Sequence, residues 1–281
     1  MLLLTYRRAA RERVTVDRLR SAGPGTMSDF MKISAVALAG LSLAVLAAGC
    51  GKEERALAEE RPVEPASVAA PEAVDPPLVA TEMAVPGDLP AFVVTGRGGA
   101  CPRMVFLHGM CGHGLGYVQA MQGAAREHGG VLGLQGDVPC GGGPFSKYSP
   151  NPEEQDRRIR SALAACGGEA EDLVVIGYSQ GAYIAERLAE RWPERYARLV
   201  LIGAPTTPAA ARLRDIRGAV MISGEHDAKY RMKEGAGGLM AAKIPAVYRE
   251  MPGARHGEMP EAERVMDEAL DWLDANARPR P

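Results

Sequence analysis

DLVVIGYSQGAYIAERL, residues Asp172–Leu188, is the stretch that decides how the rest of the chain is interpreted. Its apolar run Leu173–Ile176 has the length and β-branched content of a buried parallel strand. A tight turn, GYSQG, follows with Ser179 at its apex, and from Ala182 the apolar residues recur at helical spacing. Strand, turn and helix in this order are the setting in which G-x-S-x-G predicts a nucleophilic serine. The alternative is that G-x-S-x-G occurs by chance in a glycine-rich chain. A chance match would not require a strand before it and a helix after it.

The turn suits chemistry on a hydroxyl group. At the apex the hydroxyl stands clear of its neighbours and close to a helix N-terminus, whose unpaired N–H groups favour developing negative charge. Gly177 and Gly181 flank the turn because a Cβ would clash where the backbone doubles back. A serine also needs a base to accept its proton and a carboxylate to orient that base. In this arrangement the acid and then the histidine follow the serine along the chain.

Two loops downstream offer the acid and the base. The predicted strand Ala219–Ser223 leads into GEHD, which places Asp227 beyond the end of that strand. The predicted strand Ala246–Glu250 is followed by GARHG, which contains His256. Open α/β sheets carry their sites beyond the carboxyl ends of their strands. We therefore predict a catalytic set of Ser179, Asp227 and His256.

Each of these assignments has an alternative. Asp227 could be a solvated charge or a helix cap, and His256 could be an exposed turn residue. Glu225 is the alternative acid. His226 is the alternative base, and a weaker one, because it comes too early in the chain.

Predicted strands and helices alternate between residues 88 and 276. The expected strands are 91–95, 104–107, 130–134, 173–176, 199–202, 219–223 and 246–250. The expected helices are 117–128, 152–165, 182–192, 232–242 and 260–276. This alternation predicts an α/β fold with a mainly parallel sheet and helices on both faces. No stretch between these elements is long enough for a separate lid domain.

At these residues the chain resembles the α/β-hydrolase superfamily, and in general character its compact, lidless serine esterases. The resemblance covers roughly residues 88–276 and rests on GYSQG, GEHDA, ARHGE and the loop LHGMCGHG, residues 107–114. It implies that the backbone N–H groups of Met110 and Gln180 bind the oxyanion of a tetrahedral intermediate. A shift of one residue would put Cys111 in place of Met110. Such donors act through their position, because the charge appears only as the reaction proceeds.

The same loop could be mistaken for a metal site, since it holds His108, Cys111 and His113. No carboxylate or Cys-x-x-Cys pair accompanies them, so we expect no metal. The expected chemistry also needs no organic cofactor. The formal net charge is −2, and no Lys/Arg-rich face alternates with aromatic residues, so we expect no nucleic-acid partner.

The N-terminal sequence indicates export. After Lys32 an apolar run ends at LAAGC, and this run is shorter than the roughly 20 residues of a membrane-spanning helix. LAAGC resembles a bacterial lipobox, with Ala47 where leucine is usual. The resemblance implies that residues 27–50 are a lipoprotein signal peptide and that Cys50 is lipidated. An ordinary cleaved signal with a spare cysteine is the alternative.

Three further segments flank the signal and the folded domain. Residues 1–26 are Arg-rich and precede Met27 and Met31, so we expect an artefact of the assigned gene start or a basic extension. Residues 51–87 are rich in Pro, Ala, Glu and Val, which predicts a disordered tether between a lipid anchor and the domain. Residues 277–281 form a short C-terminal tail.

The cysteines fit an exported protein. Once Cys50 is lipidated four remain, and an even number in an exported chain indicates two disulfides. In the expected sheet order Cys101 and Cys166 precede neighbouring strands, while Cys111 and Cys140 follow neighbouring strands. We therefore predict the pairs Cys101–Cys166 and Cys111–Cys140, the second of which would brace the oxyanion loop.

The resulting hypothesis is an exported, lipid-anchored serine hydrolase of the cell envelope. It would cleave a carboxylic ester, either a small molecule or a lipid-like acyl ester, through an acyl-enzyme on Ser179. Thioester or amide hydrolysis and acyl transfer would use the same residues, and a binding lipoprotein without turnover is the alternative from another class. Oligomeric state and acyl length are not predicted. Aromatic residues on loops at this edge are candidates for lining the site: Tyr117, Phe145, Tyr148, Tyr178 and Tyr230.

Overall fold

The structure is a computed structural model that describes residues 78–280. The predictions for residues 1–26, for the signal 27–50 and for Cys50 lie outside the described residues, as does the tether up to residue 77. None of the helices between residues 78 and 280 has the length and hydropathy needed to cross a membrane.

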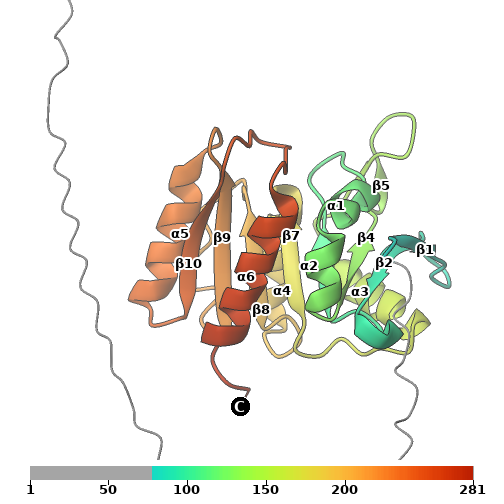
Figure 1. Ribbon diagram of the computed structural model, residues 1–281, viewed down its shortest axis with the longest axis horizontal. Helices are drawn as coiled ribbons and strands as arrows, with labels where there is room; N and C mark the ends of the chain where they lie inside the picture. Colours follow the sequence, from blue (N-terminus) through green and yellow to red (C-terminus); the bar gives the residue numbers. More distant parts are fainter. Residues whose placement is uncertain (1–77, 281) are drawn as a thin grey trace, which may run out of the picture. The chain divides into compact units, whose positions relative to one another are not determined.

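An eight-stranded sheet runs through the centre of the domain (Figure 1), in the order β1-β2-β4-β3-β7-β8-β9-β10. Its strands are β1 (Thr81–Met83), β2 (Ala91–Thr95), β3 (Met104–Leu107), β4 (Gly130–Leu134), β7 (Val174–Tyr178), β8 (Arg198–Ile202), β9 (Gly218–Gly224) and β10 (Ala246–Met251). β1 and β2 are antiparallel to their neighbours. The other six strands, β4, β3, β7, β8, β9 and β10 in sheet order, run parallel to one another. The prediction of a mainly parallel sheet is confirmed.

The parallel strands are apolar along their length because both faces of the sheet are covered. Every residue of β3 and of β7 is buried. The register sets Gly177 of β7 beside Leu107 of β3 and Tyr178 beside Ile202 of β8. The loops that follow these strands therefore leave the sheet at one edge, where open α/β sheets carry their sites.

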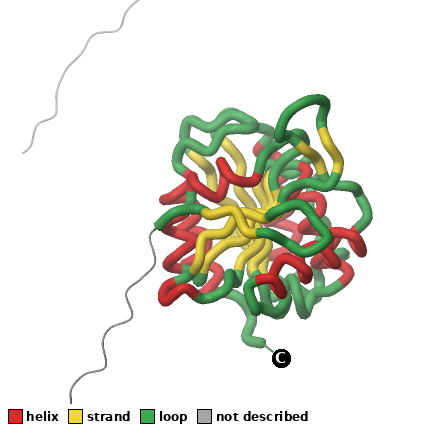
Figure 2. The backbone as a smooth tube through the Cα atoms, turned by 90° about the vertical axis from the view of Figure 1, so that its right-hand side faces the viewer, coloured by secondary structure: helices red, strands yellow, loops and turns green. Residues whose placement is uncertain are grey.

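Helices cover both faces of the sheet, and Figure 2 shows the strands in the middle with helices on either side. The helices are α1 (Gly114–Ala120), α2 (Gln122–Glu127), α3 (Pro152–Ala165), α4 (Gln180–Arg191), α5 (Lys229–Ala241) and α6 (Ala262–Asn276), with a short 3-10 helix, η1 (Arg97–Gly99). One core cluster holds the buried residues of α3, α4 and α5, and the other holds those of α1, α2 and α6. The prediction of helices on both faces is confirmed, and no lid domain is inserted between residues 78 and 280.

One predicted helix, 117–128, is in fact two helices. α1 ends at Ala120, and Met121, which has φ −131° and ψ 25°, separates it from α2. A free backbone N–H in the first turn of α2 finds its hydrogen-bond acceptor in a distant part of the chain. The carboxylate of Glu263 on α6 accepts the Ala124 N–H at 2.5 Å. A tertiary cap of this kind lets a helix begin where the local sequence predicts continuation.

The tether prediction is wrong at its C-terminal end. β1 lies within the predicted tether of 51–87 and pairs with β2, with Thr81 beside Val93. A strand of three residues in a Pro- and Ala-rich stretch has too few positions for an alternation to be recognised. A second small sheet, between β5 (Val138–Pro139) and β6 (Ser146–Lys147), was missed for the same reason.

Two disulfides tie the loops at opposite edges of the sheet. Cys101 bonds to Cys166, and Cys111 bonds to Cys140, which are the two pairs that the sequence predicts. The first pair lies at the amino ends of β3 and β7. The second joins the loop after β3 to the loop that connects β5 and β6.

Candidate active site

Ser179 lies at the turn between β7 and α4, with φ 50° and ψ −111°. A non-glycine residue at positive φ costs conformational energy and persists only where its surroundings hold it. Here the Ser179 N–H donates to the carbonyl of Ile202 at 2.8 Å, and the Ser179 carbonyl accepts from Ala182 at 3.0 Å. The flanking glycine is needed, since a Cβ at Gly181 would lie 1.9 Å from the carbonyl oxygen of Leu107.

The structure brings Ser179, His256 and Asp227 together in one hydrogen-bonded line. His256 Nε2 lies 3.0 Å from Ser179 Oγ, and His256 Nδ1 lies 2.8 Å from Asp227 Oδ2. The second carboxylate oxygen accepts the N–H of Ala228 at 2.6 Å, which fixes the carboxylate. With a proton on Nδ1 donated to Asp227, Nε2 is left to accept the serine proton.

The two alternative residues lie elsewhere. Glu225 accepts the backbone N–H of Gly253 at 2.8 Å, so it supports the loop before His256 rather than the imidazole. The His226 side chain is exposed, and its backbone N–H donates to the carbonyl of Ala254 at 2.9 Å.

Tyr178 supports the loop that carries His256, the candidate base. Its hydroxyl accepts the N–H of Gly257, next to His256. Its ring centroid lies 5.4 Å from that of Tyr117 and 5.6 Å from the His256 ring. Burial raises the pKa of Tyr178 to about 12, so the phenol stays neutral. The sequence singled out Tyr178 as a candidate lining residue, whereas the structure buries it against His256.

The loop after β3 is oriented by His108, which is fully buried. His108 Nδ1 lies 2.7 Å from the carbonyl oxygen of Gly109, and Nε2 accepts the N–H of Gly136 at 2.9 Å. Burial lowers the pKa of His108 to about 4, so the ring is neutral with its proton on Nδ1. The Gly109 carbonyl also accepts from Gly112 at 3.0 Å. Because a trans peptide sets C=O and N–H on opposite sides, the N–H of Met110 points away from His108.

Both ring nitrogens of His108 are therefore occupied, and the Cys111 sulfur is in a disulfide. These side chains are not available as metal ligands. Between residues 78 and 280 no group of three or more His, Cys, Asp or Glu side chains is placed to hold a metal ion.

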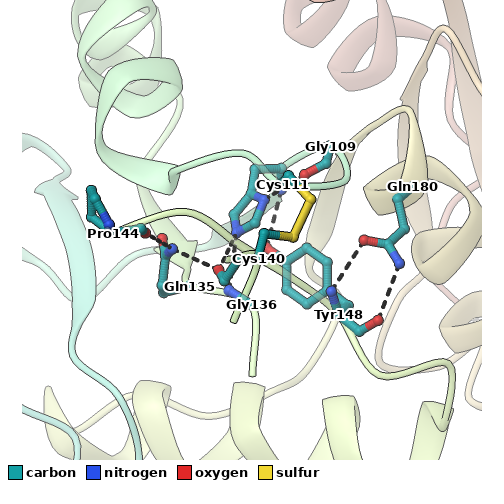
Figure 3. The surroundings of a disulfide bond; sticks show 10 residues. Gly109, Cys111, Gln135, Gly136, Cys140, Pro144, Tyr148 and Gln180 are labelled. Carbon is teal, nitrogen blue, oxygen red and sulfur yellow. Dashed lines mark hydrogen bonds between the residues drawn. A yellow bond between two sulfur atoms is a disulfide. The ribbon is translucent and has the colours of Figure 1, made fainter. Parts of the chain in front are cut away.

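The Gln180 side chain joins the serine turn to a neighbouring loop (Figure 3). Its Oε1 accepts the N–H of Tyr148 at 3.1 Å, and its Nε2 donates to the Tyr148 carbonyl at 3.1 Å. The buried Tyr148 hydroxyl donates to the Leu134 carbonyl at 2.5 Å and accepts the N–H of His108 at 3.1 Å. The sequence predicted a role only for the Gln180 N–H, which lies at the first position of α4 and has no partner within that helix.

Two hollows adjoin the loops described above, and only the smaller one includes a residue of the serine turn. One, of about 360 Å³, has all three catalytic candidates and Arg231 on its wall, and its lining residues are Ser179, Gly203, Ala204, Pro205, Asp227, Ala228, Arg231 and His256. The other, of about 720 Å³, is lined by Cys111, Gly112, His113, Leu115, Gly116, Tyr117, Gln119, Ala120, Pro144, Phe145 and Met259. Of the predicted lining residues, Tyr117 and Phe145 belong to the second hollow, and Tyr230 is exposed.

No protein-family model matches the chain, and no curated protein matches it either. Solved structures do. Esterase PE8 superposes with a TM-score of 0.50 at 19% identity, over 66% of this chain and 97% of that one. The esterase of Pyrobaculum calidifontis gives a TM-score of 0.52 at 15% identity, over 72% and 88% of the two chains. The fluorophosphonate-binding serine hydrolase F of Staphylococcus aureus gives 0.51 at 12% identity, over 69% and 97%.

This chain has the same α/β fold as these esterase structures. At these sequence identities the structural similarity establishes the fold. The chemistry of the site depends on the residues that this chain places there.

Proposed function

We propose that the protein is a serine hydrolase that cleaves carboxylic esters through an acyl-enzyme on Ser179. The observation that carries the proposal is the unbroken line from Ser179 through His256 to Asp227, with separations of 3.0 and 2.8 Å. Nucleophile, base and orienting acid within hydrogen-bond reach are the arrangement that activates a serine. The esterase names of the structural neighbours agree with an ester as the substrate.

The proposed reaction has two halves. Ser179 Oγ attacks the acyl carbon while His256 Nε2 takes its proton, and Asp227 stabilises the imidazolium. The N–H groups of Met110 and Gln180 bind the oxyanion, and His256 then gives its proton to the leaving alcohol. In the second half His256 removes a proton from water, which attacks the acyl-enzyme, and the carboxylic acid leaves as the Ser179 hydroxyl is restored.

The test uses a fluorophosphonate probe and p-nitrophenyl esters of graded chain length on protein that begins near Gly51. Ser179→Ala should abolish labelling and lower kcat by more than about a thousandfold. Ser161→Ala, a serine on α3 outside the site, is the matched control and should behave as wild type. A folded wild type that neither labels nor turns over would contradict the proposal and favour a binding protein.

We also propose that the chain is exported and held at a membrane by lipid on Cys50. Two disulfides in the domain support export, because such bonds persist in oxidising compartments. Incorporation of labelled palmitate into the wild type and its loss in Cys50→Ser would support the anchor. Equal incorporation in both, or none in either, would contradict it.

A further inference from the structure

Arg231 shares a hollow with the catalytic candidates but pairs with no acid. It lies in the first turn of α5 and lines the hollow of about 360 Å³ together with Ser179 and His256. Its guanidinium lies over the ring of Tyr230, with Cζ 5.0 Å from the ring centroid. Across the described part of the chain, no carboxylate lies within ion-pair distance of Arg231.

Asp227, the acid that lines this hollow, is engaged by other groups and forms no ion pair with Arg231. Asp227 uses one oxygen for His256 and the other for the N–H of Ala228. The neighbouring cation Lys229, by contrast, is paired with Glu250 at 3.0 Å. Arg231 therefore lines the hollow with a guanidinium that forms no ion pair with a described acid. A guanidinium in this state suits a bidentate contact with an incoming carboxylate.

The position of His256 indicates which part of the substrate lies there. His256 must hand its proton to the leaving oxygen, so that oxygen has to come within hydrogen-bond reach of Nε2. The alcohol part of an ester consequently continues along the wall that His256 and Arg231 share. The larger hollow, beside Cys111 and Phe145, has no Lys, Arg, Asp or Glu in its lining and suits an apolar acyl chain.

We propose that Arg231 selects esters whose alcohol part carries a carboxylate, and this rests on the proposed ester hydrolysis at Ser179. Arg231 binds the carboxylate of the leaving alcohol and thereby aligns the scissile carbonyl with Ser179 Oγ. A volume of about 360 Å³ is within the range of small-ligand sites and accommodates an alcohol of one ring.

The test compares two esters that differ only in charge: 4-(butanoyloxy)benzoate and its neutral counterpart 4-(butanoyloxy)benzamide. The readout is the ratio of their kcat/KM values, measured in each variant, so that the differing reactivity of the two phenols cancels between variants. Arg231→Gln should lower this ratio at least about tenfold, the scale of a hydrogen bond to a charged group. Arg231→Lys should restore part of the ratio, because it keeps the charge without the planar fork.

Lys233→Gln is the matched control. Lys233 lies on the same helix and contributes the same charge, but it lies over the ring of Tyr248 and does not line the hollow. In Lys233→Gln the ratio of kcat/KM for the charged ester to that for the neutral ester should stay within twofold of wild type. The proposal would be overturned if Arg231→Gln lowered kcat/KM equally for both esters, or lowered it for neither.

Two further measurements distinguish a failure of the role proposed for Arg231 from a failure of the proposed ester hydrolysis. Mono-p-nitrophenyl succinate carries the carboxylate on the acyl side, and greater dependence on Arg231 for this ester would overturn the assignment to the alcohol. The affinity of 4-hydroxybenzoate for Ser179→Ala, with and without Arg231→Gln, is measured by calorimetry and needs no turnover. If neither benzoate-type ester is hydrolysed, ester hydrolysis fails, and unchanged 4-hydroxybenzoate affinity would overturn the role of Arg231 independently.

Discussion

At the scale of single residues, the proton on His108 decides how the loop after β3 is built. Nδ1 must donate to the Gly109 carbonyl, while Nε2 must accept from Gly136. A second proton would remove the acceptor and place a charge in a fully buried position, which is why burial lowers the pKa of His108 to about 4. The protonated ring is thus incompatible with the observed conformation of the loop that carries Met110, the proposed oxyanion donor.

This predicts a pH-dependent stability. In the unfolded chain His108 has its ordinary pKa of 6.5, so as pH falls from 6.5 towards 4 the unfolded state binds a proton that the folded state does not. The contribution of His108 is complete above about pH 6.5 and is lost as pH falls towards 4. Between pH 7.5 and 4.5 this should lower the free energy of unfolding by about 2 to 3 kcal/mol.

Urea denaturation of the wild type and of His108→Asn, at several pH values, measures this effect. Asparagine keeps a donor near Gly109 but does not titrate in this range. The variant should be less stable at pH 7.5, and its loss of stability on acidification should be smaller by about 2 to 3 kcal/mol. Equal losses in the two proteins would show that His108 is not the group responsible.

At the scale of elements, the two disulfides should separate stability from activity. Cys111–Cys140 fixes the loop that carries Met110 to the loop that connects β5 and β6, beside the serine turn (Figure 3). Cys101–Cys166 lies at the other edge of the sheet and closes 65 residues of sequence. Oxyanion donors work only when they are held in position, so loosening the first loop should affect the reaction directly.

Replacing each pair by serine gives matched variants. Cys111→Ser with Cys140→Ser should lower kcat about tenfold in folded protein, because the Met110 N–H loses its brace. Cys101→Ser with Cys166→Ser should lower the free energy of unfolding by about 2 to 4 kcal/mol and leave kcat unchanged. Parallel kinetics and urea titrations make the comparison, and a similar loss of kcat in both would refute the assigned brace.

The elements also show what a single sequence can predict. The bounds 91–95, 104–107 and 130–134 coincide with β2, β3 and β4, because continuous apolar runs between turn residues mark buried strands. The break at Met121 was not predicted, and the hydrogen bond that caps the helix after it comes from Glu263 of α6, far along the chain. Partners far along the chain are invisible to local pattern.

The same distinction holds at the site. Ser179, Asp227 and His256 follow strand ends, and the sheet register brings such loops together, so their meeting could be predicted. The hydrogen bonds of Gln180 to Tyr148 and the placement of Arg231 in the hollow depend on side-chain directions. No spacing or composition encodes those directions.

At the scale of the whole molecule, a buried ion pair ties the N-terminal edge to the helical layer. Asp88 lies between β1 and β2, and its carboxylate accepts from Arg158 Nε at 2.8 Å. The side chains are 8% and 1% exposed. Arg158 also donates to the carbonyl of Gln135 at 2.8 Å, just after β4. The segment before β2 is thus part of the folded unit rather than the end of a tether.

Breaking this pair should cost far more than a surface ion pair, because the buried guanidinium would keep only its longer contact with Asp137, at 3.6 Å. Asp88→Asn should lower the free energy of unfolding by about 3 to 5 kcal/mol. Asp215→Asn is the control: Asp215 pairs with Arg214 at 3.2 Å, both are largely exposed, and the change should cost less than about 1 kcal/mol.

Shortening the chain tests the same point on the whole domain. A chain that begins at residue 78 retains β1 and Asp88, whereas one that begins at residue 90 lacks both and leaves Arg158 with only the longer ion pair to Asp137, at 3.6 Å. The shorter chain should unfold at a lower urea concentration than Asp88→Asn, since it also loses the pairing of β1 with β2. If both truncated chains unfold at the same urea concentration as the full chain, residues 78–89 contribute nothing to the stability of the fold, and the assignment of this segment to the folded unit is refuted.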